Sequence, residues 1–561
     1  MTAYRPENPL IVQGDHTVLV EVDNPRYPEA RDRLARFAEL VKSPEHIHTY
    51  RVSPVSVWNA CSVGVDADDI TATLRDLSKY PVPGHVETSV RDLASRYGRL
   101  TLRRDADGLV LEAADDLLME EVSRRARVEA LLGERLSATA FRVYPDDRGR
   151  LKQELVKAGY PAEDLAGYTP GEPLAIDLRS VTRGGAEFGL REYQQSAAAA
   201  FHASGTARGG SGVVVLPCGA GKTIVGMAAM AQVGASTLIL TTSVTSVRQW
   251  VRELLDKTSL HEDQVGEYSG GTKEVRPVTV ATYQILTHRN GKEADFTHLK
   301  LFDERDWGLI VYDEVHLLPA PVFQVTAGLQ ARRRLGLTAT LVREDGHEDD
   351  VFALIGPKKA DVPWKVLEGQ GWIASATCTE VRVPMSRDVR MKYAIADRRE
   401  QFRIASENPA KAEVVRAILQ QHEGEPALVI GMYLDQLKEI ARDLDVPILT
   451  GSTGQAKRDR IYADFRDGKI PVLAVSKVAN FAVDLPDASL AIQVSGTFGS
   501  RQEEAQRLGR ILRPKAGGNQ AHFYTLVSHE TVEQEFAMNR QLFLCEQGYE
   551  YHIADADEVL R

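Results

Sequence analysis

Residues 216–223 read Leu-Pro-Cys-Gly-Ala-Gly-Lys-Thr and lie between an apolar run, Val213 to Val215, and a helical pattern, Ile224 to Ala231. A strand, a glycine loop that ends in Gly-Lys-Thr and a helix start form a phosphate cradle, in which backbone N–H groups face an anion. Lys222 can reach the β- and γ-phosphates of a nucleotide, and the Thr223 hydroxyl can ligate magnesium. The stretch therefore predicts a nucleotide site on a parallel α/β sheet.

A pair of acids ends a second apolar strand. Leu309 to Tyr312 precedes Asp313 and Glu314, about ninety residues after the loop. Phosphoryl transfer depends on positioning and charge stabilisation, so Asp313 is expected to hold magnesium and Glu314 to orient the attacking water. Without Lys222, the same acids would be read as a solvated strand end.

Further motifs resemble one family. The order Gly-Ala-Gly-Lys-Thr and then Asp-Glu-Val-His resembles helicase superfamily two. The third motif of that superfamily is matched by Leu337 to Thr340, and the sixth by Gln506 to Pro514. Arg343-Glu344-Asp345 resembles a loop typical of the XPB family, and Phe523 to Ser528 with Arg540 to Tyr549 resembles the tail of that family. The resemblance covers roughly Phe188 to Ile553 and, more loosely, the N-terminal third. It implies two tandem RecA-like motor domains, the cofactors ATP and Mg²⁺, and a DNA partner that is single-stranded or a forked duplex. It also implies 3′→5′ movement and duplex unwinding in DNA repair.

The resemblance also implies site residues. Those expected to act in hydrolysis are Lys222, Asp313, Glu314, Gln506, Arg510 and Arg513, and magnesium would be held by Thr223 and Asp313. Residues expected to contact the nucleotide are Arg191, Gln194, Pro217, Cys218, Gly219, Ala220, Gly221, Lys222 and Thr223. Gln194 would read the adenine edge through its amide. Arg510 and Arg513 would act as arginine fingers from the second domain, so that ATP is gripped by both domains.

Short apolar runs alternate with helical stretches from Val213 onward. The expected strands of the first set are 213–216, 237–241, 278–282, 309–312 and 335–338, and those of the second are 427–432, 446–450, 472–475, 491–494 and 522–526. Strands interleaved with helices imply right-handed βαβ units. We expect an α/β fold with motor domains at 180–360 and 373–561, preceded by a mixed, mainly helical module at 1–168.

Candidate DNA contacts lie mostly where expected strands end. They are Thr242, Ser243, Thr282, Tyr283, Arg343, Glu344, Asp345, Ser452 and Ser476. Residues 387–403 hold six basic residues against three acids, with Tyr393 and Phe402 between them. That segment fits a short thumb that grips DNA, and it fits equally well an amphipathic helix with a solvated face. One departure from the family pattern is Ala479-Asn480 in place of the usual Gly-Asp of the fifth motif.

The N-terminal third lacks the βαβ rhythm. A helix with Ile70, Leu74 and Leu77 on one face is expected, followed by a second helix and a hairpin, 100–103 with 109–112. Together they suggest a winged-helix-like unit with a basic edge of arginines. The acidity of the region favours a module that contacts protein or regulates the motor.

Composition limits the remaining possibilities. The chain has 561 residues, a net charge of −11 and four widely separated cysteines, so no Cys-x-x-Cys metal site is indicated. No run of eighteen apolar residues and no N-terminal signal segment occur, so we expect a cytoplasmic, nucleoid-associated monomer with no membrane contact. Accessory nucleases or repair proteins are possible partners. The alternatives are a duplex-DNA translocase or an RNA helicase of the same superfamily, a restriction-enzyme motor, and a non-catalytic DNA-binding scaffold.

Overall fold

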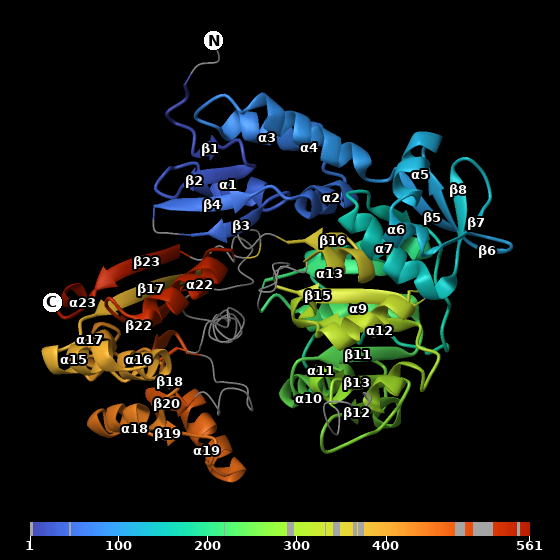
Figure 1. Cartoon of the computed structure of the whole chain (residues 1–561). Helices are drawn as coiled ribbons and strands as arrows, with labels where there is room; N and C mark the ends of the chain where they lie inside the picture. The colour runs from blue at the N-terminus through green and yellow to red at the C-terminus, as the bar shows by residue number, and fades with distance from the viewer. Residues whose placement is uncertain are drawn as a thin grey trace. The chain divides into compact units, whose positions relative to one another are not determined.

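A computed structural model shows an α/β protein that divides into two compact units, one holding most of the chain up to Val362 and the other the chain from residue 363 (Figure 1). It describes residues 4–43, 46–217, 219–288, 297–330, 332–339, 348–362, 367, 375–476, 488–496, 520–546 and 550–561. No helix among these residues is both long and apolar enough to cross a membrane.

The first unit contains a seven-stranded sheet in the order β12-β13-β11-β14-β15-β10-β16, in which every neighbouring pair is parallel. Its strands are β10 (Ser211–Val215), β11 (Thr237–Thr241), β12 (Val265–Tyr268), β13 (Val278–Thr282), β14 (Leu309–Asp313), β15 (Arg333–Thr338) and β16 (Lys358–Asp361). Its helices are α8 (Glu192–His202), α9 (Lys222–Val233), α10 (Val244–Lys257), α11 (Tyr283–Leu286), α12 (Ala320–Gly328) and α13 (Glu348–Leu354). The central strands are almost wholly buried, as expected for a parallel sheet covered on both faces.

The second unit contains another all-parallel sheet, β19-β20-β18-β21-β22-β17-β23. The strands are β17 (Ser375–Val383), β18 (Ala427–Gly431), β19 (Ile448–Leu449), β20 (Val472–Ser476), β21 (Leu490–Gln493), β22 (Gln520–Ser528) and β23 (Glu550–Asp555). The helices are α15 (Arg387–Ile395), α16 (Arg398–Ser406), α17 (Lys411–Gln421), α18 (Leu434–Asp443), α19 (Gln455–Arg466), α22 (Val532–Glu546) and α23 (Ala556–Val559). The predicted fold class, two parallel α/β domains, is confirmed.

All ten predicted strands occur, but β12, β16, β17 and β23 were not predicted. Each of these four carries charged residues that interrupt the apolar run on which the predictions relied. In β17 the buried Glu380 pairs with Arg382 at 2.5 Å and accepts a hydrogen bond of 2.6 Å from Tyr551 of β23. Polar pairing of this kind compensates the burial of the carboxylate, and it leaves no hydrophobic signature.

The N-terminal third is a mixed module with more strand than the sequence suggested. Its strands are β1 (Leu10–Val12), β2 (Thr17–Glu21), β3 (Glu39–Lys42), β4 (Ile47–Arg51), β5 (Leu100–Asp105), β6 (Gly108–Ala113), β7 (Leu132–Arg135), β8 (Ala140–Val143) and β9 (Ala162–Asp164). Its helices are α1 (Tyr27–Leu34), α2 (Pro54–Ser62), α3 (Ala67–Leu77), α4 (Gly84–Arg96), α5 (Asp116–Ser123), α6 (Ala126–Glu129) and α7 (Arg148–Lys157). They accompany two sheets, β1-β2-β4-β3 and β7-β8-β6-β5-β9.

Two local predictions for this module are confirmed and one is wrong. Ile70, Leu74 and Leu77 of α3 are fully buried, and β5 pairs antiparallel with β6. The hairpin is not the wing of a winged helix, however, because β8 and β9 extend it into a five-stranded sheet.

The arginines of the expected basic edge are engaged within the module. Arg91 pairs with Asp68 at 2.6 Å, Arg96 with Asp92 at 2.7 Å and Arg103 with Glu112 at 3.0 Å, while Arg104 donates to the Ala166 carbonyl at 3.4 Å. Three of these four arginines have acidic partners, so the expected basic edge is largely neutralised.

The backbone of helix α7 in the module lies directly against the backbone of α12 in the first motor domain. A Cβ atom at Gly149 would lie 2.3 Å from the Ala327 carbonyl oxygen of α12, so only glycine allows the two helices to approach this closely. Gln153 donates to Asp350 of α13 at 2.7 Å. The part of the module that carries α7 is therefore packed against the first motor domain, and both belong to the first unit.

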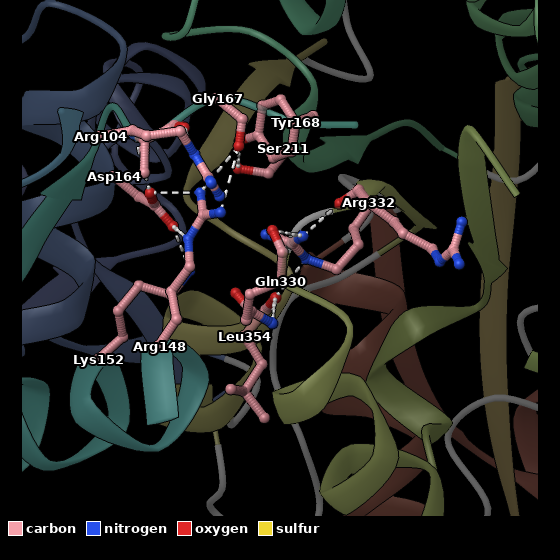
Figure 2. A network of polar contacts seen from close by, with 12 residues as sticks. Arg104, Arg148, Lys152, Asp164, Gly167, Tyr168, Ser211, Gln330, Arg332 and Leu354 are labelled. Atoms are coloured by element: carbon pink, nitrogen blue, oxygen red, sulfur yellow. Dashed lines mark hydrogen bonds and ion pairs between the residues drawn. The ribbon is translucent and has the colours of Figure 1, made fainter. Parts of the chain in front are cut away.

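A buried polar network surrounds this junction (Figure 2). Asp164 accepts hydrogen bonds from Arg148 at 2.6 and 3.1 Å and from Lys152 at 3.0 Å. Tyr168 donates to Ser211 of β10 at 2.9 Å, and its ring lies 5.8 Å from the Arg148 guanidinium. Burial opposes the ionised form of Asp164, but the neighbouring cations outweigh it and lower the pKa of this carboxyl.

Candidate nucleotide-binding and hydrolysis site

The glycine loop connects β10 to α9, as the sequence predicts. Its first residue, Leu216, donates its N–H to the Thr338 carbonyl of β15 at 2.9 Å, which fixes where the loop leaves the sheet. Gly219 and Gly221 have φ values of 79° and 80°, in the left-handed region where other residues are strained. Gly221 directly precedes α9, and a Cβ atom there would lie 2.5 Å from the Gln194 amide nitrogen. The turn and its neighbour both require glycine at position 221.

Lys222 and Glu314 form an ion pair between the loop and the end of β14. The Lys222 Nζ lies 2.9 Å from the Glu314 Oε1, and each side chain is 13% exposed. Glu314 has φ 52° and ψ 55°, a left-handed conformation that a non-glycine residue adopts at a cost of about 1–3 kcal/mol. This backbone geometry places the carboxylate beside Lys222, as the predicted site requires.

Asp313 is held by two aromatic residues. Its Oδ2 accepts a hydrogen bond of 2.9 Å from the Trp250 indole N–H, and its carbonyl accepts one of 3.0 Å from the Tyr283 hydroxyl. Burial, followed by repulsion from Glu314, raises the pKa of Asp313 to about 6, against the opposing effects of Trp250 and Lys222. The carboxylate is therefore ionised at neutral pH and becomes protonated in mild acid.

Glu314 has the opposite electrostatic balance. Burial favours its protonated form, but attraction to Lys222 and His316 and a hydrogen bond from the Ala339 N–H outweigh that effect and lower its pKa. The His316 Nδ1 lies 3.7 Å from Glu314 and 2.7 Å from the Thr338 hydroxyl. His316 thus connects the Glu314 carboxylate to the end of β15.

The donor set fits ATP and magnesium. Carboxylate and hydroxyl oxygens are the ligands magnesium prefers, and Asp313 and Thr223 supply one of each. The hydrogen bond from Trp250 to Oδ2 fixes the orientation of the Asp313 carboxylate. The left-handed glycines and the start of α9 supply backbone N–H groups for phosphate.

The expected adenine-reading pair lies next to the loop. Gln194 is 4% exposed, its Oε1 accepts the Arg191 backbone N–H at 3.0 Å, and its Nε2 donates to the Tyr193 hydroxyl at 3.4 Å. The Arg191 guanidinium donates to the same hydroxyl at 3.1 Å. In this arrangement the Gln194 amide caps α8, so reading adenine would require it to exchange these bonds.

The expected DNA-contacting side chains differ in exposure. Ser243 caps α10 by accepting the Ser246 N–H at 3.2 Å, next to the partly exposed Thr242, and the exposed Ser452 hydroxyl lies 2.9 Å from that of Thr450. Thr282 and Tyr283 are buried, at 2% and 3% exposure, and Ser476 is 1% exposed. Contacts from these last three side chains would need a local rearrangement, because folding places them inside the sheet edge.

The thumb-like segment forms α15 and α16. Phe402 is fully buried against Phe536, with ring centroids 5.1 Å apart, and the Tyr393 hydroxyl accepts the Val532 N–H at 2.8 Å. Arg398 pairs with Glu535 of α22 at 2.9 Å. Phe402 is therefore buried against α22 and is not available for base stacking, and the hydroxyl of Tyr393 attaches α15 to the start of α22.

Several predicted site residues lie outside the described residues, and their predictions stay untested. They are Cys218, Arg343, Glu344, Asp345, Ala479, Asn480, Gln506, Arg510 and Arg513.

Trp250 and His316 are site residues to which sequence reasoning assigned no role. Trp250 lies in the middle of the amphipathic α10, sixty-three positions before Asp313, and looks there like an ordinary core residue. His316 belongs to the Asp-Glu-Val-His motif, so its position was a usable signal.

Comparison with known proteins gives consistent matches along the chain. The family described as ERCC3/RAD25/XPB C-terminal helicase matches residues 367–560, Helicase conserved C-terminal domain matches 10–137, and Type III restriction enzyme, res subunit, matches 187–343. The N-terminal third, whose resemblance was only loose, is therefore included.

Relatives match over nearly their full length. The DNA 3′-5′ helicase XPB of Kineococcus radiotolerans is 55% identical over 99% of this chain and 97% of its own, and that of Mycobacterium tuberculosis is 54% identical over 99% of both. The general transcription and DNA repair factor IIH helicase/translocase subunit XPB of Enterocytozoon bieneusi is 33% identical over 97% of this chain and 92% of its own. The chain belongs to the XPB family of DNA helicases.

Proposed function

We propose that the chain is an ATP-dependent DNA helicase that couples hydrolysis to 3′→5′ movement and duplex unwinding in DNA repair. The observation that carries the chemical part is the Lys222–Glu314 pair at 2.9 Å, which brings the phosphate-binding amine and the water-orienting carboxylate to one point beside Asp313. Direction and substrate rest on the named activities of the relatives.

The residues divide the chemistry among them. Lys222 and the loop N–H groups hold the phosphates, Thr223 and Asp313 hold magnesium, and Glu314 accepts a hydrogen bond from the attacking water. Bound magnesium neutralises charge on the transferred phosphoryl group. Lys222 lies 2.9 Å from Glu314, so the same amine can reach the phosphates only if this pair separates, which would release the carboxylate to water.

The second motor domain completes the proposed machinery. Gln506, Arg510 and Arg513 would stabilise the charge on the γ-phosphate, and closure of the two domains on ATP followed by release would drive stepping. Thr242, Ser243 and Ser452 would grip the sugar–phosphate backbone through hydroxyl and N–H groups, and Arg343-Glu344-Asp345 would act at the strand junction.

Strand displacement on forked, 3′-tailed and 5′-tailed duplexes, with phosphate release measured in parallel, tests this proposal. We expect unwinding of forked and 3′-tailed DNA and DNA-stimulated hydrolysis. Lys222→Ala and Glu314→Gln should each lower turnover at least a hundredfold. Lys257→Ala, a matched control whose amine pairs with Glu253 at 2.8 Å at the end of α10, should keep full activity.

Two results would contradict the proposal. Hydrolysis stimulated by duplex DNA without any strand displacement would identify a translocase. Stronger stimulation by matched RNA than by DNA would indicate an RNA-acting enzyme, because discrimination between the two depends on the 2′-hydroxyl.

A further inference from the structure

Two histidines and a glutamate meet on the second unit, outside the nucleotide site. His422 follows α17, Glu425 lies in the turn before β18, and His522 lies on β22. One potential ligand atom from each of the three lies within 4.8 Å of the others, and all three residues are partly buried. The His422 and His522 ring centroids are 4.6 Å apart, and the Nδ1 of His422 is 3.1 Å from the Glu425 Oε1. Segments separated by about a hundred residues thus converge with the chemistry of a metal site.

Tyr524 gives His422 the orientation that a metal ligand needs. Its hydroxyl lies 3.0 Å from the His422 Nε2. If Nε2 carries the proton and donates to this oxygen, the Nδ1 lone pair points to Glu425. Metal-bound histidines usually donate their second ring N–H to a fixed oxygen, which sets the tautomer. Without a cation, a lone pair and a carboxylate at 3.1 Å repel each other, so either a proton or a metal ion must lie between them.

His522 differs from His422 in its surroundings. Within the part of the chain that the structure describes, its ring forms no hydrogen bond, and it lies tilted by 49° against the His422 ring. A neutral imidazole beside a carboxylate suits a divalent cation.

We propose that His422, Glu425 and His522 bind a zinc ion, with water as the fourth ligand. Two histidines and one glutamate form an established tetrahedral zinc set, with metal–ligand distances of about 2.0–2.2 Å and hence ligand atoms about 3.3 Å apart. The His422–Glu425 separation of 3.1 Å already meets that requirement. The three ligand atoms lie within 4.8 Å of one another, so the His522 atom must move closer to the other two when the ion binds. The Glu425 side chain is 36% exposed and can adjust to this movement.

A zinc ion bound by these residues would connect the end of α17 and the turn before β18 to β22, which is an inner strand of the sheet. The ligands come from elements that build the second unit and none of them belongs to the nucleotide site, so we expect the ion to stabilise this unit. Binding to the folded state alone would raise the melting temperature in proportion to the logarithm of the zinc concentration.

The test uses the full chain stripped of metal with a chelator and then dialysed against zinc. We expect one equivalent of zinc by elemental analysis, micromolar or tighter binding by calorimetry, and visible absorption of a tetrahedral complex when Co²⁺ replaces zinc. His422→Ala, His522→Ala and Glu425→Gln should each weaken binding at least tenfold. His552→Ala, which removes an exposed histidine of β23, should leave it unchanged.

Asp313→Asn separates this site from the magnesium site. Zinc retained by that variant and lost from His422→Ala/His522→Ala supports the proposal, whatever the helicase assays show. Glu425→Gln guards against misfolding, because an amide replaces the carboxylate without loss of volume. Equal zinc uptake by the natural chain and the double variant, or retention by all three single variants, would overturn the proposal.

Discussion

Replacing Trp250 by phenylalanine tests the electrostatics of the site most directly. The indole N–H donates to the Asp313 carboxylate at 2.9 Å, and this bond helps to limit the pKa of Asp313 to about 6. A hydrogen bond to a charged group contributes about 1.5–3 kcal/mol. Because one pKa unit corresponds to about 1.4 kcal/mol, the variant should raise this pKa by about 1–2 units, to about 7–8.

The expected effect has a definite sign. Magnesium requires the ionised carboxylate, so activity falls as the pH drops through the pKa of Asp313. In Trp250→Phe the ionised fraction at pH 7 should fall about fourfold, taking the new pKa as about 7.5, whereas at pH 9 the two proteins should be nearly equal.

The assay is kcat/KM for magnesium–ATP between pH 5.5 and 9.5, since its acidic limb reports a group of the free enzyme. Trp307→Phe is the matched control, because its buried indole donates to the Leu301 carbonyl at 2.9 Å, away from the acids. An acidic limb that stays at the same pH in Trp250→Phe, or that moves equally in both variants, would refute the reasoning.

Three further predictions concern stability. Asp313→Asn should abolish hydrolysis yet raise the free energy of unfolding by about 1–3 kcal/mol at pH 7.5. A carboxyl whose pKa is higher in the folded than in the unfolded protein destabilises the fold when it is ionised. The gain in stability, measured by urea unfolding, should therefore vanish below about pH 4, where the carboxyl is protonated in both states. Asp164→Asn should lower the free energy of unfolding by about 3–5 kcal/mol, because it leaves the buried Arg148 uncompensated. In the wild type, the stability contributed by this carboxylate should decline below about pH 4. An unchanged urea midpoint in the variant would contradict this prediction. Gly149→Ala should cost about 1–3 kcal/mol, because its Cβ would meet the Ala327 carbonyl at 2.3 Å, and limited proteolysis should then release the N-terminal module.

Sequence patterns predicted the sheets well where strands are continuously apolar. Val278–Thr282 forms β13 at the predicted bounds because every residue in it is buried. β17 was missed because Glu380 and Arg382 interrupt its apolar pattern, and only their mutual pairing inside the fold makes the strand stable. The spacing of apolar residues in a sequence reveals which apolar positions are buried. It does not reveal charged residues that are buried because they pair with each other.

The chemical site was predictable where one residue type has one use. Gly221, Lys222 and Glu314 came from a short loop and a strand end whose spacing is set by phosphate geometry. Trp250 could not be predicted, because its role depends on α10 and β14 lying side by side, a relation that no local pattern encodes. The burial of Tyr283 was missed for the same reason.

The glycine contact between α7 and α12 has a mechanical consequence. Where the backbones of two helices touch, no flexible side chain lies between them to absorb a movement. At Gly149, α7 of the N-terminal module is therefore stiffly coupled to α12 of the first motor domain. A displacement of α7 is therefore expected to pass directly to α12, which packs in the domain that carries Lys222.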